Sequence, residues 1–350
     1  MFKEKKFLSL KKRWIFLIII LLFVNFYQFP YYFTKPGDAK VLHTVIEVAG
    51  AYEDEGTFLL TTVRMGKANV VNYYWAKWSN SRELIHEDFI RRGGETDEDY
   101  HHRQMMMMSS SQDIATIVAY NYAGKKAYYE NYGVFVTGTV EGMPAFGLLQ
   151  VGDLITEVDE NKITTVDELL AQLEDKRKND EVFLTVVRDD TKTKLELSVT
   201  TFPEDLDSAQ DRVGIGITSP ITKRELIASP IIKIDTNKIG GPSAGLMFSL
   251  EIYNQIIKED ITKGYAIAGT GSLNEVGEVG RIGGAKQKVI AAERAGANFF
   301  FAPNEFDSLT SNYTEALQTA EENNVKMKIV PIDTFEDAIK FLATLDPKKN

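Results

Sequence analysis

The stretch Gly240-Gly241-Pro242-Ser243-Ala244-Gly245 constrains the fold of this chain more than any other segment. Glycines adopt backbone angles that side chains forbid. Pro242 suits the first turn of a helix, because it lacks an N–H that would have no helical partner there. The apolar residues 246–253 that follow are typical of a buried helix. The pattern therefore predicts a tight turn with Ser243 at a helix N-terminus, where free N–H groups and the helix dipole favour negative charge.

Two interpretations of this turn stay open at this point. Ser243 is either a nucleophile or a structural N-cap of the following helix. As a nucleophile it would need donors for a developing oxyanion, and the backbone around Gly241, Pro242 and Ala244 lies in the right place to supply or position them. The turn alone does not separate the two roles.

Composition restricts the remaining possibilities. The formal net charge of −10 argues against nucleic acid as a partner. The absence of cysteine excludes disulfides, thiolate metal sites and a cysteine nucleophile. No metal site or cofactor is expected from the sequence. A length of 350 residues is enough for roughly two domains.

The first forty residues predict a membrane anchor. Residues 1–13 form a basic tail, and residues 14–34 carry no charge. Such a segment is long enough to span a bilayer, and the basic flank predicts a cytoplasmic N-terminus. A cleaved signal peptide is the alternative, but large aromatic residues stand where its small-residue cleavage site should be. We expect a single-pass protein of the cell membrane, with residues 41 onward on the extracellular side and lipid in contact with the anchor.

Residues 127–202 resemble a PDZ domain. Short strands, a Gly152-Asp153 turn, a helix over 166–176 and two closing strands follow one another. The resemblance implies binding of a peptide as an added strand. The segment Tyr132-Gly133-Val134-Phe135 resembles the family loop that caps the peptide carboxylate. A plain small β domain without a ligand is the alternative.

Residues 41–126 and 203–346 flank that region. The first segment predicts strands at 40–49 and 57–63, an exposed loop at 91–102 and a helix near 107–120. The second alternates strands and helices, as an α/β or α+β domain does.

The chemistry of Ser243 depends on its base. All four histidines precede Ser243, so an α/β-hydrolase order of catalytic residues is excluded. A lysine can serve if burial lowers its pKa. On a helical wheel for residues 285–295, Lys286 falls within the apolar face and Lys288 outside it. Lys286 is therefore the predicted buried lysine, either as the base or as a snorkelling surface residue.

A family resemblance decides between these roles. The turn at 240–245, the segment Ala268-Gly269-Thr270-Gly271 and the segment 277–288 resemble the proteolytic domain of Lon proteases. That resemblance implies a serine–lysine dyad, with Ser243 as nucleophile, Lys286 as base and Thr270 hydrogen-bonded beside the lysine. Departures at residues 239–240, 272 and 281 leave the dyad residues in place.

With its anchor, the whole chain resembles the membrane-anchored PDZ/Lon-like proteases of Gram-positive bacteria. The fold implied is α+β, a Lon-type proteolytic domain with an inserted PDZ-like domain. No Walker motif occurs, so no nucleotide is expected, and substrates would be peptides or unfolded, membrane-tethered proteins. The alternative is a catalytically inactive, membrane-tethered PDZ scaffold that binds peptide ends.

Overall fold

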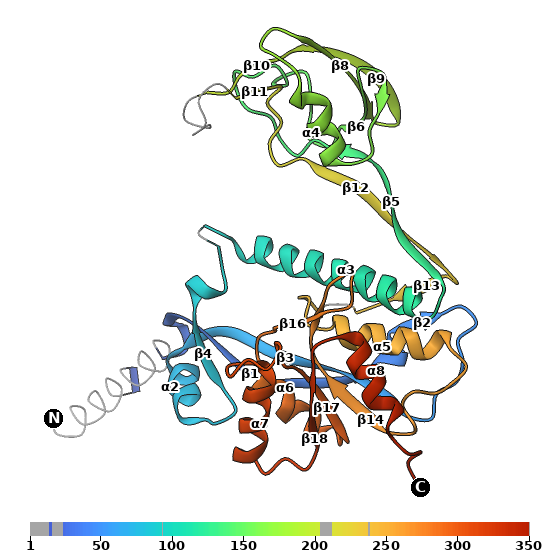
Figure 1. Ribbon diagram of the computed structural model, residues 1–350. Coiled ribbons are helices and arrows are strands. Elements are labelled where there is room, and N and C mark those ends of the chain that lie inside the picture. The colour runs from blue at the N-terminus through green and yellow to red at the C-terminus, as the bar shows by residue number, and fades with distance from the viewer. Residues whose placement is uncertain (1–13, 16–23, 93, 204–211, 237–238, 350) are drawn as a thin grey trace, which may run out of the picture. The chain divides into compact units, whose positions relative to one another are not determined.

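A computed structural model describes the chain except for residues 1–13, 16–23, 93, 204–211, 237–238 and 350. Two compact units make up the chain, and Figure 1 labels their helices and strands. Unit 1 comprises Met1–Ala127 and Ala228–Asn350, and unit 2 comprises Tyr128–Ile227. Unit 2 is therefore an insertion in the sequence of unit 1.

Unit 1 is built from helices and strands contributed by both of its segments. Its strands are β1 (Gln28–Val41), β2 (Ile46–Val48), β3 (Thr57–Asn69), β4 (Glu83–His86), β13 (Ile232–Ile234), β14 (Ala266–Gly269), β15 (Ser272–Leu273), β16 (Val279–Gly280), β17 (Phe299–Pro303) and β18 (Lys328–Ile332). Its helices are η1 (Leu42–Thr44), α2 (Val70–Trp78), η2 (Glu87–Phe89), α3 (Asp97–Tyr122), α5 (Gly245–Ile256), α6 (Ala285–Arg294), α7 (Asn312–Glu322) and α8 (Phe335–Ala343).

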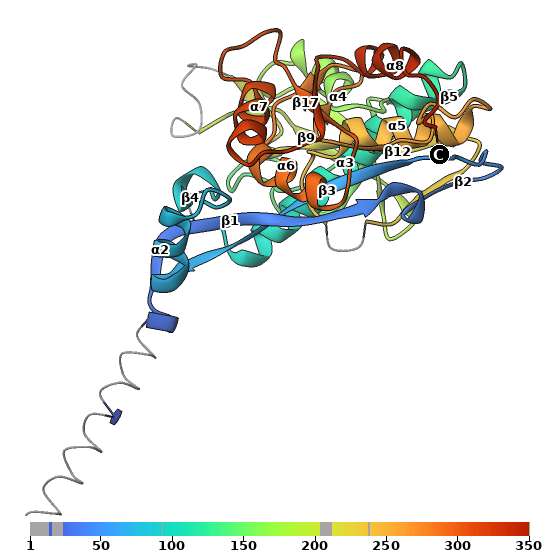
Figure 2. The same cartoon turned by 90° about the horizontal axis from the view of Figure 1, so that it is seen from below.

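A six-stranded mixed sheet forms the centre of unit 1, in the order β18-β17-β14-β3-β1-β4. The strands from β18 to β3 run parallel, whereas β1 is antiparallel to both of its neighbours. Figure 2 shows β1 and β3 side by side along most of their length. Since β3 joins the two halves of this sheet, both sequence segments of unit 1 are needed to form it.

Alternating residues of the central strands bury the two faces of the sheet against different helices. On one face, Leu59, Ala268 and Phe300 share a core with Val289 of α6 and Ala316 of α7. On the other face, the rings of Phe299 and Phe301 contact Phe341 of α8. Helix α5 packs against α8 and β3, and a side chain at Gly269 would collide with Met247 of α5. The unit is therefore a sheet between two helical layers, as its alternating pattern predicts.

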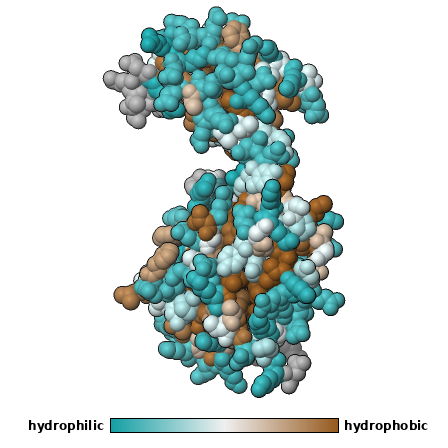
Figure 3. Space-filling model, turned by 45° about the vertical axis from the view of Figure 1, so that its right-hand side comes forward, coloured by the Kyte–Doolittle hydropathy of each residue, from teal (hydrophilic) through white to brown (hydrophobic). Residues whose placement is uncertain are grey.

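Unit 2 is a small β-rich body around one helix. Its elements are β5 (Lys126–Phe135), β6 (Leu154–Val158), β7 (Asn161–Lys162), α4 (Val166–Glu174), β8 (Glu181–Arg188), β9 (Thr191–Ser198), β10 (Thr200–Thr201), β11 (Val213–Gly214) and β12 (Ile221–Ser229), of which β5 and β12 continue into unit 1. The sheet has the order β12-β5-β6-β8-β9. Its core includes Val134, Ile155 and Leu184, with Leu169 of α4. On the side seen in Figure 3, hydrophilic side chains cover most of this unit.

The predicted membrane anchor at 14–34 differs from the structure at its C-terminal end. Residues 16–23 lie outside the described residues, as does the basic tail 1–13. Gln28–Val41 is strand β1, and Tyr32 to Thr34 pair with both β3 and β4, so these residues belong to the folded unit. Among the described residues, no helix combines the length and the apolarity needed to cross a membrane.

Two other boundaries also differ. The expected exposed loop at 91–102 ends early because Thr96 forms a capping box with Asp99 and starts α3 at Asp97. His101 and His102 nevertheless lie exposed, now on the first turns of that helix. The inserted unit continues past the predicted boundary at 202 to Ile227, because the strand segment 213–217 completes its core.

Helix α5 carries a buried acidic residue, Glu251. Glu251 is fully buried and accepts a 2.6 Å hydrogen bond from Gln255 Nε2. Its second oxygen and Asp54 Oδ2 are buried and accept no hydrogen bond among the described residues, although Asp54 Oδ2 lies 3.9 Å from His43 Nδ1. Burial raises the pKa of Glu251 to about 7, and the charges of Asp54 and Asp260 add to that rise. Glu251 is therefore largely protonated below neutral pH.

We predict that this acid makes unit 1 less stable at alkaline pH. A carboxyl whose pKa is higher in the folded than in the unfolded state stabilises the fold at low pH, and that stability is lost as pH rises through about 7. Glu251→Gln should remove this decrease in the free energy of unfolding, which reaches about 3 kcal/mol at 1.4 kcal/mol per pKa unit. The loss falls between the ordinary pKa of 4.5 and the folded pKa of about 7, so chemical denaturation of both proteins at pH 5 and pH 8.5 measures most of the effect. Equal pH dependence in the two proteins would contradict the assignment.

Candidate functional site

Ser243 lies where the glycine-rich turn enters α5. Gly241 has a φ of +91°, a left-handed conformation that suits glycine. Gly240 packs so closely on Gln104 of α3 that a Cβ would lie 2.8 Å from the Cβ of Gln104. Ala244 is the N-cap of α5, and Ser243 is half-buried just before it. The turn therefore has the form predicted from the sequence, with Ser243 immediately before the helix N-terminus.

The side chain next to Ser243 is that of Lys288. Lys288 Nζ lies 2.7 Å from Ser243 Oγ and 2.8 Å from Thr270 Oγ1. Thr270 Oγ1 in turn donates to the backbone oxygen of Ser243 at 2.9 Å. The prediction that Thr270 bonds beside the lysine agrees with these contacts, although the lysine is a different one. Three side chains from α6, the end of β14 and the α5 turn therefore form one closed group.

Lys288 is buried in this group. Lys288 is 3% exposed, and among the described residues no carboxylate forms an ion pair with it. Burial alone lowers the pKa of Lys288 from 10.5 to about 7. A large fraction of Lys288 is therefore neutral near pH 7 and able to accept a proton.

The prediction that Lys286 is the buried lysine of α6 is wrong. Lys286 is only half-buried, and its backbone N–H, not its side chain, makes the contact to Glu315 at 3.3 Å. The wheel failed because α6 is buried around most of its circumference. The small residues Ala285, Ala291 and Ala292 let the helix approach its neighbours closely, and Lys288 projects from that side.

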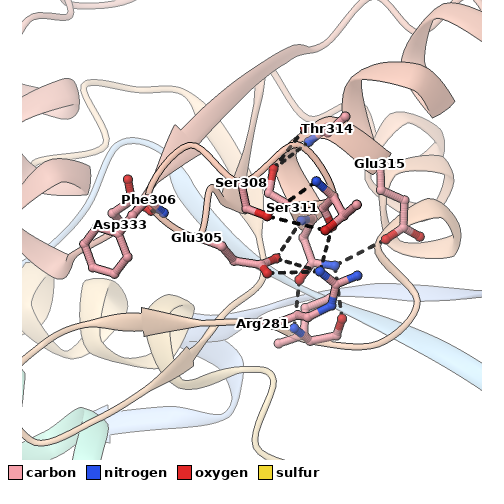
Figure 4. A network of polar contacts seen from close by, with 11 residues as sticks. Arg281, Glu305, Phe306, Ser308, Ser311, Thr314, Glu315 and Asp333 are labelled. Carbon is pink, nitrogen blue, oxygen red and sulfur yellow. Dashed lines mark hydrogen bonds and ion pairs between the residues drawn. The ribbon is translucent and has the colours of Figure 1, made fainter.

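A polar network fixes the turn that leads into α6 (Figure 4). Arg281 Nη1 lies 3.0 Å from Glu305 Oε2 and donates to the backbone oxygen of Thr310 at 2.7 Å. Asn312, at the start of α7, bonds both the N–H and the oxygen of Ile282 at 2.8 and 3.1 Å. Glu315 then accepts from the N–H of Lys286. These bonds hold the first turn of α6, and with it the direction of Lys288.

Helix α3 fixes the serine turn from the opposite side. The N–H of Gly241 donates to Gln104 O at 2.8 Å, so this group is not free to bind an oxyanion, contrary to its predicted role. Ser111 Oγ donates to Pro242 O at 3.1 Å. The residues Gln104 and Ser111 were missed by sequence reasoning, because polar residues on a long helix carry no signal of their partner.

These bonds also orient the remaining N–H groups of the turn. Pro242 O is bonded by Ser111, and Ser243 O by Thr270 and by the N–H of Gly271 at 3.0 Å. In a trans peptide the N–H points opposite to the carbonyl. The N–H groups of Ser243 and Ala244 therefore point away from these donors.

A cleft of about 890 Å³ opens over Ser243 and Lys288. Strands β1 and β3, helix α3 and the glycine turns at 240–241 and 283–284 line it. Its wall carries both acidic and basic side chains, namely Asp38, Glu83, Lys40 and Arg64. The site is thus an open cleft of mixed charge, large enough for several residues of an extended chain.

Unit 2 has a cavity of its own, of about 800 Å³, between α4 and the segment 213–217. The segment Tyr132, Gly133, Val134 and Phe135 does not line it, and the expectation that this segment is a loop is wrong. These residues belong to β5, which lies between β12 and β6 in the sheet, and Val134 is in the core. The alternation Val213-Gly214-Ile215-Gly216-Ile217 was the sequence signal for the lining strand, and it was missed.

The site offers no set of metal ligands. In the part of the chain that the structure describes, no three histidine or carboxylate side chains come together in a way that could hold an ion.

Two family models match the chain. Residues 108–199 match the PDZ domain family, and residues 235–344 match the C-terminal proteolytic domain of Lon protease. The PDZ match ends before the segment 213–217 that lines the cavity of unit 2. The chain therefore has an α+β fold that contains a PDZ domain and a Lon-type proteolytic domain.

Curated relatives are similar to part of the chain. A Lon protease of Aster yellows witches'-broom phytoplasma is 33% identical over 97 residues, which cover 28% of this chain and 11% of the relative. An archaeal Lon protease of Thermoplasma acidophilum is 32% identical over 111 residues, covering 32% of this chain and 16% of the relative. The match thus spans only a small part of the length of these relatives.

One solved structure is similar to part of the chain. It is the PDZ domain of an SdrC-like protein from Listeria monocytogenes, 28% identical, covering 25% of this chain and 88% of that one. The TM-score is 0.23.

We predict that the reactivity of Ser243 rises with pH through about 7. Lys288 accepts the serine proton only when neutral, and its lowered pKa places that change near 7 instead of 10.5. The rate of labelling by a fluorophosphonate, measured from pH 5.5 to 9, should increase about tenfold per pH unit below the midpoint and then level off. A rate that is flat over this range, or that still rises at pH 9, would contradict the assignment of Lys288.

Proposed function

We propose that this chain, whose two domains are those of a PDZ/Lon-like serine protease, is an ATP-independent endopeptidase that acts through Ser243 and Lys288. The observation that carries the proposal is the 2.7 Å contact between Ser243 Oγ and a buried lysine amine. A structural N-cap serine needs no such partner. A buried lysine is costly to keep, since burial disfavours its charge.

The proposed reaction begins with neutral Lys288. Ser243 Oγ attacks the carbonyl carbon of a peptide bond, and its proton passes to Lys288 Nζ. The tetrahedral intermediate then collapses, the C–N bond breaks, and Lys288 gives the proton to the leaving amine. Water repeats the sequence on the acyl-enzyme, with Lys288 again as base, and releases the carboxylic acid. Thr270 holds the amine of Lys288 toward Ser243 throughout.

The oxyanion would be bound by backbone N–H groups of the serine turn. Those of Ser243 and Ala244 point away from the bonds that hold their peptide planes, and they lie at the N-terminus of α5. The helix dipole adds to their effect. Gly241 and Pro242 act by shaping the turn, since one N–H is already bonded and the other is absent.

The substrate class follows from what the chain carries. Its sequence has no Walker motif for an unfolding motor, so we propose peptides and unfolded protein segments as substrates. The uncharged and largely apolar residues 14–27 support a single-pass membrane anchor, with the two units at the extracellular side. Substrates would then be exported peptides or small membrane-tethered proteins.

The groove of unit 2 is the proposed docking site for a substrate segment. Apolar residues of α4 and of the strand 213–217 line it, and Arg212 lies at its edge. PDZ domains bind a peptide as an added strand in such a groove. We assign this role to the segment 213–217 in place of Tyr132 to Phe135.

We predict that substitution of Lys288 abolishes catalysis, whereas substitution of Lys286 on the same helix does not. Ser243→Ala and Lys288→Gln should each lower kcat for a peptide substrate by at least about 10³-fold, because either one removes the base-activated nucleophile. Lys286→Gln, two residues away on the same helix, should change kcat less than about threefold. Steady-state cleavage of a fluorogenic peptide measures all three variants.

The same variants test the alternative of an inactive scaffold. Circular dichroism and thermal unfolding confirm that each variant is folded. If wild type and Ser243→Ala cleave equally slowly, the chain is a scaffold and the proposed function is wrong. If Lys286→Gln is the inactive variant, the assignment of the base is wrong.

We predict that the groove of unit 2 affects substrate capture and leaves the chemical step unchanged. Leu170 lies on α4 in the groove and is half-exposed. Leu170→Glu should raise KM for an unfolded protein substrate about tenfold and leave cleavage of a short peptide unchanged. Phe183→Glu, an equally exposed apolar residue outside that groove, is the matched control. Equal effects of the two substitutions would contradict the assignment of the groove.

A further inference from the structure

Helix α2 presents an apolar face that is largely exposed among the described residues of unit 1. Val71, Tyr74, Trp75 and Trp78 occupy positions i, i+3, i+4 and i+7, which lie on one side of a helix. They are 50%, 49%, 54% and 83% exposed. Scattered exposed apolar residues are normal, but four on one short helix form a continuous patch.

This face is held rigidly by the opposite side of α2. The ring of Tyr73 stacks on Phe29 of β1 at 4.4 Å and meets Tyr31 edge-on at 5.5 Å. Ala76 is buried, and Asn69 caps the helix by accepting from Asn72. Since the helix is fixed by these contacts, the exposure of its aromatic face is a property of the fold and does not come from fraying.

The face lies at the point where the chain enters unit 1. Figure 2 shows α2 beside the first residues of β1, and Asn69 Nδ2 reaches Asn25 O at 3.4 Å. Two further apolar residues belong to segments at this end of the sheet. Phe26 precedes β1 and is 77% exposed, and Phe89, which follows β4 through η2, is 86% exposed. Exposed apolar side chains therefore occur on α2, just before β1 and on η2.

The chemistry of the patch matches the boundary between lipid and water. Tryptophan and tyrosine have an apolar body and a polar tip, and they are enriched at membrane interfaces. Although the chain is acidic overall, α2 contains no carboxylate, and its charged residue is Lys77. Arg82 covers the ring of Trp75 at 3.6 Å. Cations beside aromatic rings suit the phosphate level of a bilayer.

We propose that this face of α2, with Phe26 and Phe89, docks into the headgroup region of the membrane. The inference rests on the proposed anchor, because residues 14–27 would place this end of β1 at the bilayer surface. It adds a second contact that fixes how unit 1 stands on the membrane. The cleft begins at Thr34 of β1, six residues from Gln28 or about 20 Å along a strand. That distance suits cleavage of substrates that emerge from the same bilayer.

Tryptophan fluorescence tests the docking directly. The chain has three tryptophans, Trp14, Trp75 and Trp78, so Trp14→Phe leaves only those of α2. The full-length variant is reconstituted in phosphatidylcholine–phosphatidylglycerol vesicles containing lipids brominated at shallow or deep acyl positions. We expect at least about 30% quenching, stronger for the shallow bromines, and loss of most of it in Val71→Glu/Tyr74→Glu.

A tryptophan at the far end of the same sheet is the matched control. Tyr52 is half-exposed before β3, whose 13 residues separate it from α2 by about 40 Å. In a chain with all three tryptophans changed to phenylalanine, Tyr52→Trp should show no quenching. Quenching of the α2 tryptophans no stronger than that of the control would overturn the proposal. A change in tryptophan emission that depends on protein concentration and not on brominated lipid would also overturn the proposal. It would assign the face to a second copy of the chain.

Two further measurements distinguish a failure of this inference from a failure of the proposals on which it rests. Peptide cleavage by the same vesicles reports on Ser243 and Lys288 independently of quenching. Quenching with no cleavage would refute the endopeptidase and leave the docking in place. Loss of the chain from vesicles at alkaline pH would refute both the anchor and the docking.

Discussion

The account depends on one buried amine. Lys288 sits among the small side chains of α6 and reaches Ser243 and Thr270 with hydrogen bonds of 2.7 and 2.8 Å. Because burial lowers its pKa to about 7, its charge in the folded state at acidic pH costs roughly 5 kcal/mol at 1.4 kcal/mol per pKa unit. The stability of the rest of unit 1 has to offset that cost. A group of this kind is typical of functional sites.

Much of unit 1 holds the two sides of this contact at a fixed distance. Helix α3 binds the serine turn through Gln104 and Ser111, and the start of α7 binds the turn before α6 through Asn312. Strand β14 supplies Thr270 between them. The site therefore depends on long-range contacts between elements that are distant in sequence, including α3 from the segment before unit 2.

The sequence predicted the parts of this structure that depend on local patterns. The glycine turn before α5, the helices α6 and α8 and the inserted β-rich unit follow from spacing, caps and alternation. The identity of the reactive lysine did not follow from such patterns. A helical wheel drawn from the largest apolar residues ignores alanines, which pack just as closely. The peptide loop at Tyr132 to Phe135 also failed, since its strand looks the same whether it lies at an edge or inside the sheet. The C-terminal limit of the anchor was missed because aromatic residues 29–33 suit a membrane interface and a buried strand equally well.

The protonation state of Lys288 tests the central claim most directly. A protein with ¹³C-labelled lysine side chains can be titrated by NMR from pH 5 to 11, with the Lys288 resonance assigned from its absence in Lys288→Arg. The account predicts a midpoint of about 7 for Lys288. Ser243→Ala should move this midpoint only slightly, because burial causes the shift. A midpoint near the ordinary value of 10.5 would mean that the amine is charged and solvated, and would contradict its role as the base.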